Sequence, residues 1–436
     1  MKRILITVTA LFFIFQIYAQ ESEANVRKIT VEEAVSLAAD NNISIQKEKI
    51  SLDFTKKQKN YSWNSVSPSI SLSASGRGSI GSGTNEAWSS GKQKSSDPSF
   101  SASALLNLNL SPAVVIAVQN AKLSYEAGEI TYEAMVRSVE LNVRKSFYSL
   151  LNSKENIAVQ ESALASAKQT YEANLEKYKQ GRISELDLLN AQYNYEKKVP
   201  QLESLKQSYE ISLDSFKQVL GLKLTEKIEL TGDLEAAAEA VINEKKIMKN
   251  LDEIPDVKKA KLSVDSAKLS LASQRYAAWG PTFSAGLTAT ESITNKTLSV
   301  DYNFGVSLPL DGYLPWSSKA LNVENQKANY EKQKLTLEDV KTSTAIKIRS
   351  SYNSILQAQT QLDMYEKNVS IMQRAYEMTL SAYNAGSRDF LALQNAVDNL
   401  ATAKNTLQSQ RLTIISAILE LENTLGVPFG SLGQNE

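Results

Sequence analysis

Tyr178-Lys-Gln-Gly181-Arg182 and Tyr383-Asn-Ala-Gly386-Ser387 begin two blocks of this 436-residue chain that repeat each other. The blocks, residues 178–222 and 383–427, align without a gap, and both end in Leu-Gly followed by an aliphatic residue. A repeat of this kind indicates that one ancestral unit was duplicated, so it is interpreted before any shorter motif.

The segments upstream of these blocks repeat as well. Ile50-Ser51-Leu52-Asp53 matches Leu262-Ser263-Val264-Asp265, and Pro68 and Pro281 each precede alternating small residues. Each half therefore reads as a helix, two strand-like stretches, a very long helix, a turn and a second long helix. We expect a first structural repeat over residues 20–222, a linker or equatorial region over 223–250 and a second repeat over 251–436.

Residues 1–19 have the organisation of a secretory signal peptide. Lys2-Arg3 is a positive region, the residues from Ile4 to Phe15 are apolar, and Ala19 supplies a small residue before the expected cleavage site. The apolar core is too short to cross a membrane, and no later run reaches the ~20 apolar residues that a membrane helix needs. We therefore expect an exported chain without a helical anchor.

Composition argues against an enzyme. The chain has no cysteine and no histidine, which excludes catalytic triads and zinc sites built from those residues. No phosphate-binding loop occurs. Basic and acidic residues both number 48 and are interleaved along the helical stretches, so no excess charge points to nucleic acid. We expect no catalytic residue, no cofactor, no metal and no nucleic-acid partner.

Four segments alternate apolar and small polar residues with a period of two, which is the pattern of a β-strand. In one of them Val300, Tyr302 and Phe304 alternate with Asp301 and Asn303. Their lengths are close to the roughly 9–11 residues of a tilted transmembrane strand. One apolar face and one small polar face suit lipid on one side and water on the other. We expect these strands at about residues 67–79, 99–110, 281–291 and 298–310.

Four strands cannot close a barrel. An open sheet is not tolerated in lipid because its edge groups have no hydrogen-bond partner there, and bacterial single-chain barrels have about eight strands or more. Two copies of the chain would supply eight strands and three copies twelve, so oligomerisation follows if the strands span a membrane. A soluble two-faced sheet is the alternative for the same pattern.

The segments between the strands and the Gly-containing turns are unusually long helices. From Ala113 to Lys179 the chain has no proline and one glycine, which corresponds to about 100 Å of helix at ~1.5 Å per residue. Each long helix turns at Gly181 or Gly386 and returns as a second helix that stops at Leu-Gly. We expect helices at about residues 113–180, 184–221, 317–384 and 388–425.

The returning helices carry narrow apolar seams. On the second of them, successive spacings of seven, seven, four, three and four residues join Leu400, Leu407, Ile414, Ile418, Leu421 and Leu425. This spacing is typical of coiled-coil packing, so the seams are interpreted as helix-to-helix contacts without chemistry of their own.

With these elements in place the chain resembles the TolC family of outer-membrane efflux proteins. The resemblance rests on the N-terminal helix Ile29-Thr30-Val31-Glu32-Glu33-Ala34-Val35, on Asn41-Asn42, and on the twin Tyr-x-x-Gly…Leu-x-x-x-Asn-Ala blocks. It covers essentially all of the mature chain. The resemblance implies a homotrimer in the outer membrane, with a twelve-stranded β-barrel continuous with a coiled-coil α-helical barrel in the periplasm.

The resemblance also implies a function. The family exports solutes or proteins as the outer-membrane part of a tripartite efflux or secretion system. A periplasmic adaptor, or membrane fusion protein, and an inner-membrane RND, ABC or MFS transporter open its periplasmic tip. The sequence leaves open the cargo, the pump class and the ion selectivity. The alternative is a periplasmic coiled-coil structural or adaptor protein without a membrane barrel.

By this resemblance three residues are gate candidates at the hairpin tips. Asp187 occupies the family's acidic position after the first tip glycine, and Tyr383 and Arg388 occupy the positions that link to it from the second hairpin. Charge-assisted hydrogen bonds between them would hold the tip closed. The alternative for Asp187 is a solvated acid near the positive end of a helix dipole.

The chain departs from the family at the constriction. Ala392 and Asn395 stand where the family's best-known members carry an aspartate ring. The ring is either missing or has moved to Asp389 or Asp398, which removes the basis for a cation selectivity inferred from the family.

Overall fold

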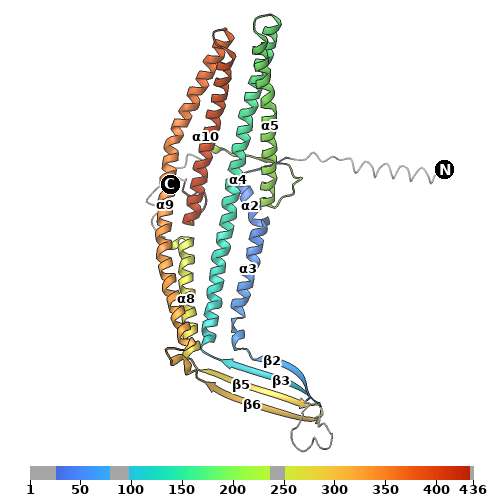
Figure 1. The fold of residues 1–436 in the computed structure, drawn as a ribbon, viewed down its shortest axis with the longest axis vertical. Helices are drawn as coiled ribbons and strands as arrows, with labels where there is room; N and C mark the ends of the chain where they lie inside the picture. The colour runs from blue at the N-terminus through green and yellow to red at the C-terminus, as the bar shows by residue number, and fades with distance from the viewer. Residues whose placement is uncertain (1–25, 79–97, 236–250, 433–436) are drawn as a thin grey trace, which may run out of the picture. The chain divides into compact units, whose positions relative to one another are not determined.

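The structure is a computed structural model, and it describes residues 26–78, 98–235 and 251–432 (Figure 1). The expected signal peptide, most of the loop between the first two strands and part of the expected linker lie outside these residues. The remaining expectations can be compared with the described elements.

The chain divides into two compact units. The hairpin unit combines residues 1–48, 133–254 and 345–436, and the sheet unit combines residues 49–132 and 255–344. Each unit takes segments from both sequence repeats, so the two repeats are interleaved in the fold.

Helices make up most of the described chain. The α-helices are α2 (Val31–Asn41), α3 (Ile43–Asn60), α4 (Ala113–Lys179), α5 (Glu185–Leu220), α8 (Pro255–Trp279), α9 (Ser318–Asn384) and α10 (Phe390–Leu425). Three short 3-10 helices are η1 (Ser62–Val66), η3 (Leu251–Glu253) and η4 (Asp311–Tyr313). Among the described helices, none has a stretch long and apolar enough to span a membrane.

The strands form two sheets. β1 (Arg27–Ile29) pairs in parallel with β4 (Ile228–Leu230), while β2 (Ser69–Arg77), β3 (Ser99–Leu110), β5 (Thr282–Ser292) and β6 (Thr297–Ser307) form an antiparallel sheet in the order β2-β3-β5-β6. The sequence analysis did not predict the β1–β4 pair, because a three-residue strand carries too little periodicity to be recognised.

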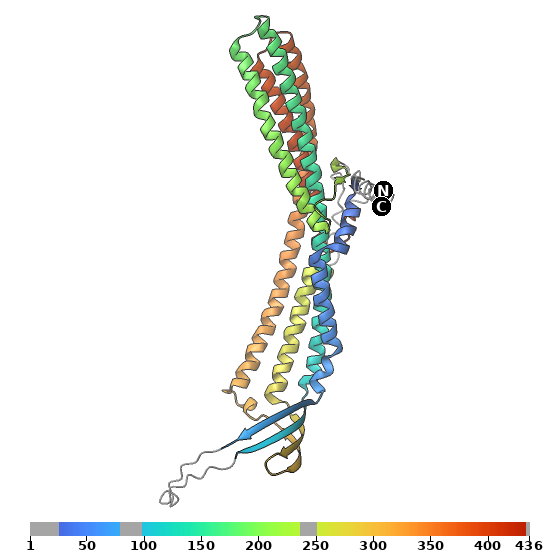
Figure 2. The same cartoon turned by 90° about the vertical axis from the view of Figure 1, so that its right-hand side faces the viewer.

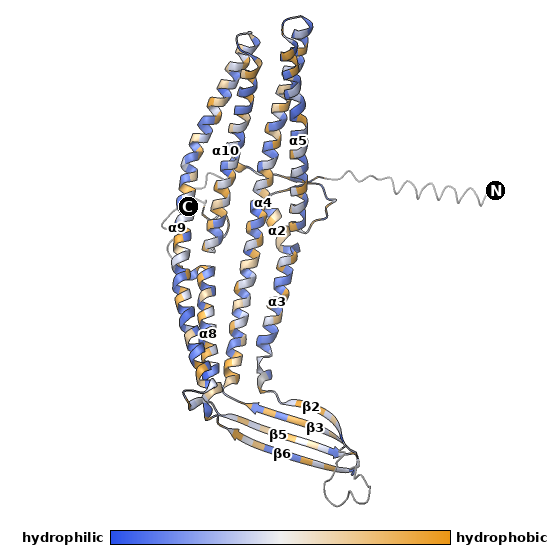
Figure 3. Ribbon diagram, viewed as in Figure 1, coloured by the Kyte–Doolittle hydropathy of each residue, from blue (hydrophilic) through white to orange (hydrophobic). Residues whose placement is uncertain are grey.

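The register of the four-stranded sheet separates apolar from polar residues. One cross-strand row joins Ile70, Leu106, Leu287 and Tyr302, and the next polar row joins Ser69, Asn107, Gly286 and Asn303. Residues that lie opposite each other in an antiparallel sheet share a face, so the sheet has one apolar and one small polar face. Figure 3 shows the alternation along the strands.

The last strand ends earlier than expected. The alternating pattern predicts a strand to residue 310, but β6 ends at Ser307 and the chain turns into η4. Pro309 has no backbone N–H to donate to a sheet, which is a physical reason for the strand to stop before it. The alternating side chains Leu308 and Leu310 therefore belong to the connection to α9.

The chain forms two helical hairpins, α4–α5 and α9–α10 (Figure 2). The hairpin unit contains α5, α10 and the C-terminal parts of α4 and α9. α4 and α9 each have 67 residues, and α5 and α10 each have 36, so the duplicated sequence blocks have folded into equal elements. α5 begins after the N-cap Ser184 and α10 after the N-cap Asp389; both end at a left-handed glycine, Gly221 or Gly426. Five of the expected seam residues on α10 are buried, namely Leu400, Leu407, Ile414, Ile418 and Leu421, whereas Leu425 at the helix end is half-buried.

The N-terminal motif packs against the end of the first hairpin. Thr30 caps α2 by accepting a hydrogen bond from the backbone of Glu33. The amide Nδ2 of Asn42 donates to the carbonyl of Val219 at 3.0 Å, and Asn41 lies directly against Gly221. The N-terminal motif therefore stabilises the C-terminal end of α5 through Asn41 and Asn42.

The C-terminal turn is fastened to α4 and α10 through Glu422, whose side chain is fully buried. Its carboxylate accepts backbone hydrogen bonds from Gly430 at 2.9 Å and Leu432 at 3.0 Å. Arg137 donates to the carbonyls of Glu422 and Gly426, at 3.1 and 3.0 Å. These contacts hold the end of α10 and the residues that follow it as one packed group.

Stability should depend on pH through Glu422. Burial raises the pKa of this carboxyl above its ordinary value of 4.5, while the two backbone N–H groups and Arg144 act in the opposite direction. A raised folded-state pKa contributes stability that is fully present below pH 4.5 and is lost as the pH rises through the raised value. Glu422→Gln cannot ionise, so its urea midpoint should lose this part of the pH dependence. Identical pH profiles for the two proteins would contradict the assignment.

Candidate functional site

The sequence-predicted gate residues lie at or near the tips of the two hairpins. Gly181 and Gly386 have positive φ angles of 67° and 77°, a backbone conformation that favours glycine. The N–H of Arg182 donates to the carbonyl of Lys177 at 2.9 Å, and that of Ser387 donates to Ala382 at the same distance. Such bonds are typical of a helix that ends at a left-handed glycine, so the tips are tight, well-defined turns.

Asp187 caps its own helix. Its backbone N–H donates to Oγ of Ser184 at 3.2 Å, and its carboxylate accepts the Ser184 hydroxyl at 2.7 Å. The two residues form a capping box in which each side chain serves the other's backbone. Within one chain, Asp187 therefore acts as an acid in the first turn of α5, which is the alternative interpretation given above.

Tyr383 reaches from the second hairpin to the first. Its hydroxyl donates to Oδ1 of Asn174, whose side chain is fully buried, and Nζ of Lys177 lies 4.6 Å from the centre of its ring. Burial raises the pKa of Tyr383; the bond to Asn174 lowers it, and the charge of Asp187 raises it. Within one chain Tyr383 is thus bonded to Asn174, and a link to Asp187 of another copy stays a prediction.

The sequence analysis missed Asn174 and Lys177. Asn174 lies about one helical turn before Tyr178, on a helix rich in polar residues, so its sequence neighbours did not distinguish it. Its partner is 209 residues away, and no local pattern encodes that distance.

The remaining tip residues divide into exposed and capped positions. Arg388 is exposed, and its side chain has no hydrogen-bond or ion-pair partner in the described part of the chain, so it is available to another copy or protein. Asn395 is exposed and Ala392 is half-buried. Asp389 accepts the backbone N–H of Ala392 at 2.8 Å and is the N-cap of α10.

Asp398 forms the second link between the hairpins. Its Oδ1 lies 2.9 Å from Nζ of Lys198 on α5, and the Lys198 side chain is only 12% exposed. A buried ammonium that lacked this carboxylate would be costly. Within one chain the charge of Asp398 is therefore paired with a lysine of the neighbouring helix.

Together these contacts define what the site can do. Tyr383–Asn174 joins α9 to α4, and Lys198–Asp398 joins α5 to α10. No group of three or more acidic side chains that could hold a metal ion occurs among the described residues. The arrangement can hold or release helices, and it offers no set of groups for bond-making chemistry.

Comparison with known sequences decides the family. The outer membrane efflux protein family matches residues 34–222 and 247–427, which together are most of the chain. The chain belongs to this family. Membership confirms the resemblance seen in the sequence, places the protein in the outer membrane, and agrees with the prediction that it is not an enzyme, since these proteins are channels.

Solved structures of outer-membrane channels confirm the fold. The Campylobacter jejuni outer-membrane channel CmeC superposes with a TM-score of 0.74 at 19% identity, over 93% of this chain and 87% of that one. The Vibrio cholerae outer-membrane protein VceC gives a TM-score of 0.70 at 15% identity, over 92% of this chain and 96% of that one.

One sequence relative has no assigned function. An uncharacterised protein of Haemophilus influenzae is 29% identical over 180 residues, 39% of this chain and 37% of the relative. The chain thus matches little more than a third of that relative's length. The match supports kinship and carries no information on cargo.

Proposed function

We propose that this outer membrane efflux protein works as a homotrimeric channel-tunnel that passes solutes or proteins across the outer membrane. The observation that carries the proposal is the four-stranded sheet, with one apolar face, one small polar face and two free edges. The apolar face suits lipid, and the polar face suits a water-filled lumen.

The free edges require partners. Within the described residues β2 and β6 each pair on one side only. Unpaired N–H and C=O groups are not tolerated in the hydrocarbon core. Joining β6 of one copy to β2 of the next, three times, would close a barrel of twelve strands and remove every edge.

The mass of the purified protein in detergent tests this proposal. Native mass spectrometry should give three copies of the mature chain. A stable monomer would overturn the proposal, because its sheet edges would have no partners.

Disulfide trapping tests which edges meet. The chain has no cysteine, so paired cysteines scanned along β2 and β6 report on those strands alone. Inside one chain these strands are three strand spacings apart, roughly 14 Å, whereas a disulfide needs Cα atoms about 4.4–6.8 Å apart. Cross-linked dimers and trimers should therefore appear on denaturing gels. Their absence at every register would exclude this edge pairing.

The hairpin tips are exposed and could be opened by contact with other proteins. Exposed Arg388 and the exposed side chains around both turns leave the tips free to meet a periplasmic adaptor, and through it an inner-membrane transporter of the RND, ABC or MFS class. In this proposal the cargo is selected by that transporter.

The gate should respond to loss of its polar contacts. Asp187→Ala combined with Tyr383→Phe should raise ion conductance in planar bilayers. The variant removes the Ser184–Asp187 cap and leaves buried Asn174 without its partner, a cost of about 1–3 kcal/mol to the closed tip. Tyr178→Phe is a matched control, since Tyr178 is the repeat equivalent of Tyr383 and its hydroxyl makes no hydrogen bond in the described chain. Equal conductance of all three proteins would remove these residues from the gate.

A further inference from the structure

Exposed aromatic and basic side chains gather at one end of the four-stranded sheet. The register places the first residue of β2, the last of β3, the first of β5 and the last of β6 at the same end. η1 lies against β3, and η4 lies against the end of α8, where the indole N–H of Trp279 donates to the carbonyl of Gly312 at 2.8 Å. Both 3-10 helices therefore belong to this end of the sheet (Figure 1).

Four aromatic side chains on these connections are largely exposed. Trp63 in η1 is 64% exposed and Trp316, which follows η4, is 81% exposed. Tyr61 and Tyr313 are similarly exposed. Large aromatic residues are rarely left so open in water without a partner, and a cluster of them marks an interaction surface.

Basic residues precede the first pair of aromatics. The end of α3 reads Lys56-Lys57-Gln58-Lys59-Asn60-Tyr61-Ser62-Trp63. Lys59 stacks over the ring of Tyr125 at 4.5 Å, whereas Lys56 and Lys57 are exposed and have no side-chain partner in the described part of the chain. The surface therefore combines aromatic rings with unneutralised positive charge.

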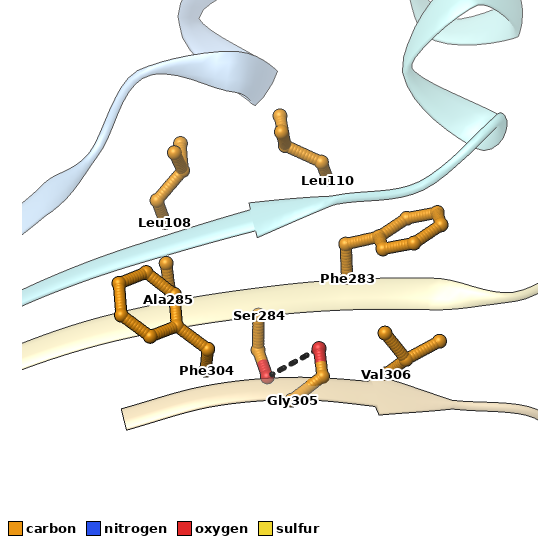
Figure 4. Close-up of a pocket in the computed structure, with 8 residues that line it drawn as sticks. All are labelled: Leu108, Leu110, Phe283, Ser284, Ala285, Phe304, Gly305 and Val306. Carbon is orange, nitrogen blue, oxygen red and sulfur yellow. Dashed lines mark hydrogen bonds between the residues drawn. The ribbon is translucent and has the colours of Figure 1, made fainter. Parts of the chain in front are cut away.

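An apolar depression of about 290 Å³ opens on the sheet beside this end (Figure 4). Leucine side chains of β3, Phe283 of β5 and Phe304 and Val306 of β6 line it. Phe283 and Val306 each lie one residue from the strand terminus. The apolar depression thus lies next to the aromatic and basic side chains at the end of the strands.

We infer that Lys56, Lys57, Tyr61, Trp63, Tyr313 and Trp316 form a lipid-binding collar for anionic phospholipid of the periplasm-facing leaflet. Tryptophan and tyrosine favour the membrane–water interface, because each joins an apolar ring to a polar group. Lysines at that level attract anionic headgroups. The acyl chain of the bound lipid lies along the depression on the apolar face. This inference rests on the proposed membrane barrel. It adds the position of the membrane–water interface along the barrel and the lipid that is bound there.

Fluorescence quenching locates the collar. The chain has four tryptophans. Trimers that retain a single one, with Phe at the other positions, are reconstituted in phosphatidylethanolamine–phosphatidylglycerol vesicles with brominated acyl chains. Trp63 and Trp316 should lose more emission to bromines near the headgroup than to bromines near the chain end, and little to aqueous iodide. Trp279, which is partly buried against the helix core, should lose less to either bromolipid.

Two outcomes overturn the collar. Quenching of Trp63 and Trp316 by iodide but not by bromolipid would place them in water, and quenching by neither would place them between protein surfaces. Phe304→Trp in a tryptophan-free background separates this failure from failure of the barrel, since Phe304 is on the apolar face. If that reporter is quenched by bromolipid while the collar is not, the barrel stands and the collar fails. If neither is quenched, the barrel fails too.

The lysines are tested by lipid retention. Lys56→Gln with Lys57→Gln should reduce the phosphatidylglycerol that co-purifies with the trimer, by roughly fivefold for each lysine removed. Lys258→Gln with Lys259→Gln is the matched control, an exposed lysine pair at the start of α8, the helix end remote from the sheet. Equal retention in both double variants would remove the lysines from the collar.

Discussion

Replacement of Gly221 by alanine should lower the free energy of unfolding by about 2–5 kcal/mol. Gly221 ends α5 with a φ of 72°, which costs a residue with a Cβ about 1–2 kcal/mol. A Cβ built there would also lie 2.5 Å from Cβ of Asn41 and 3.1 Å from its carbonyl oxygen. Asn41 cannot easily retreat, because the next residue, Asn42, is bonded to Val219.

Gly181 is the matched control for this prediction. It has nearly the same φ, 67°, but no atom lies within 4 Å of the position its Cβ would take. Gly181→Ala should therefore cost only the conformational part, about 1–2 kcal/mol. Urea unfolding followed by far-ultraviolet circular dichroism compares the two variants. Equal losses would contradict the claim that close packing against Asn41 requires glycine at 221.

Glu422→Ala should also be strongly destabilising, by about 2–6 kcal/mol. The variant leaves two buried backbone N–H groups, those of Gly430 and Leu432, without an acceptor. It also removes a carboxylate that acts electrostatically on Arg137 and Arg144, two cations that pack on the ring of Phe429. Arg144 keeps its ion pair with Glu140 at 3.0 Å, so the loss comes mainly from the two N–H groups, each of which costs about 1–3 kcal/mol when it is buried without an acceptor.

Glu420 provides the control on the same helix. Its carboxylate pairs with Lys145 at 2.5 Å, but the side chains are 58% and 34% exposed. Exposed pairs contribute about 0–1 kcal/mol, so Glu420→Ala should change the urea midpoint very little. If Glu420→Ala and Glu422→Ala shifted the midpoint equally, burial would not be the cause of the Glu422 effect.

The two glutamates illustrate how far sequence patterns reach. Glu422 lies four residues after Ile418 and seven after Ile415, so helical periodicity puts it on the apolar seam, and this signal was available in the sequence. The seam indicates that Glu422 is buried. It does not indicate that the turn at Gly430 supplies the hydrogen bonds, because that turn has no periodicity.

The gate residues illustrate the opposite limit. The repeat and the resemblance selected Asp187 and Tyr383 as a possible pair. In the structure each has another partner within the chain, Ser184 and Asn174. Asp398, one of the two possible replacements for the missing aspartate ring, instead neutralises Lys198 across the hairpins.

The sequence by itself determined the elements of this protein: the duplicated hairpins, the long helices, the two-faced strands and the glycine turns. These depend on period, length and local backbone preference, which neighbouring residues encode. Only the tertiary structure decided the β1–β4 pair, the partners of Tyr383 and Asp398, and the close packing of Asn41 on Gly221. Those contacts join residues far apart in the chain, and their energy comes from burial and hydrogen bonding that exist only after the helices have packed.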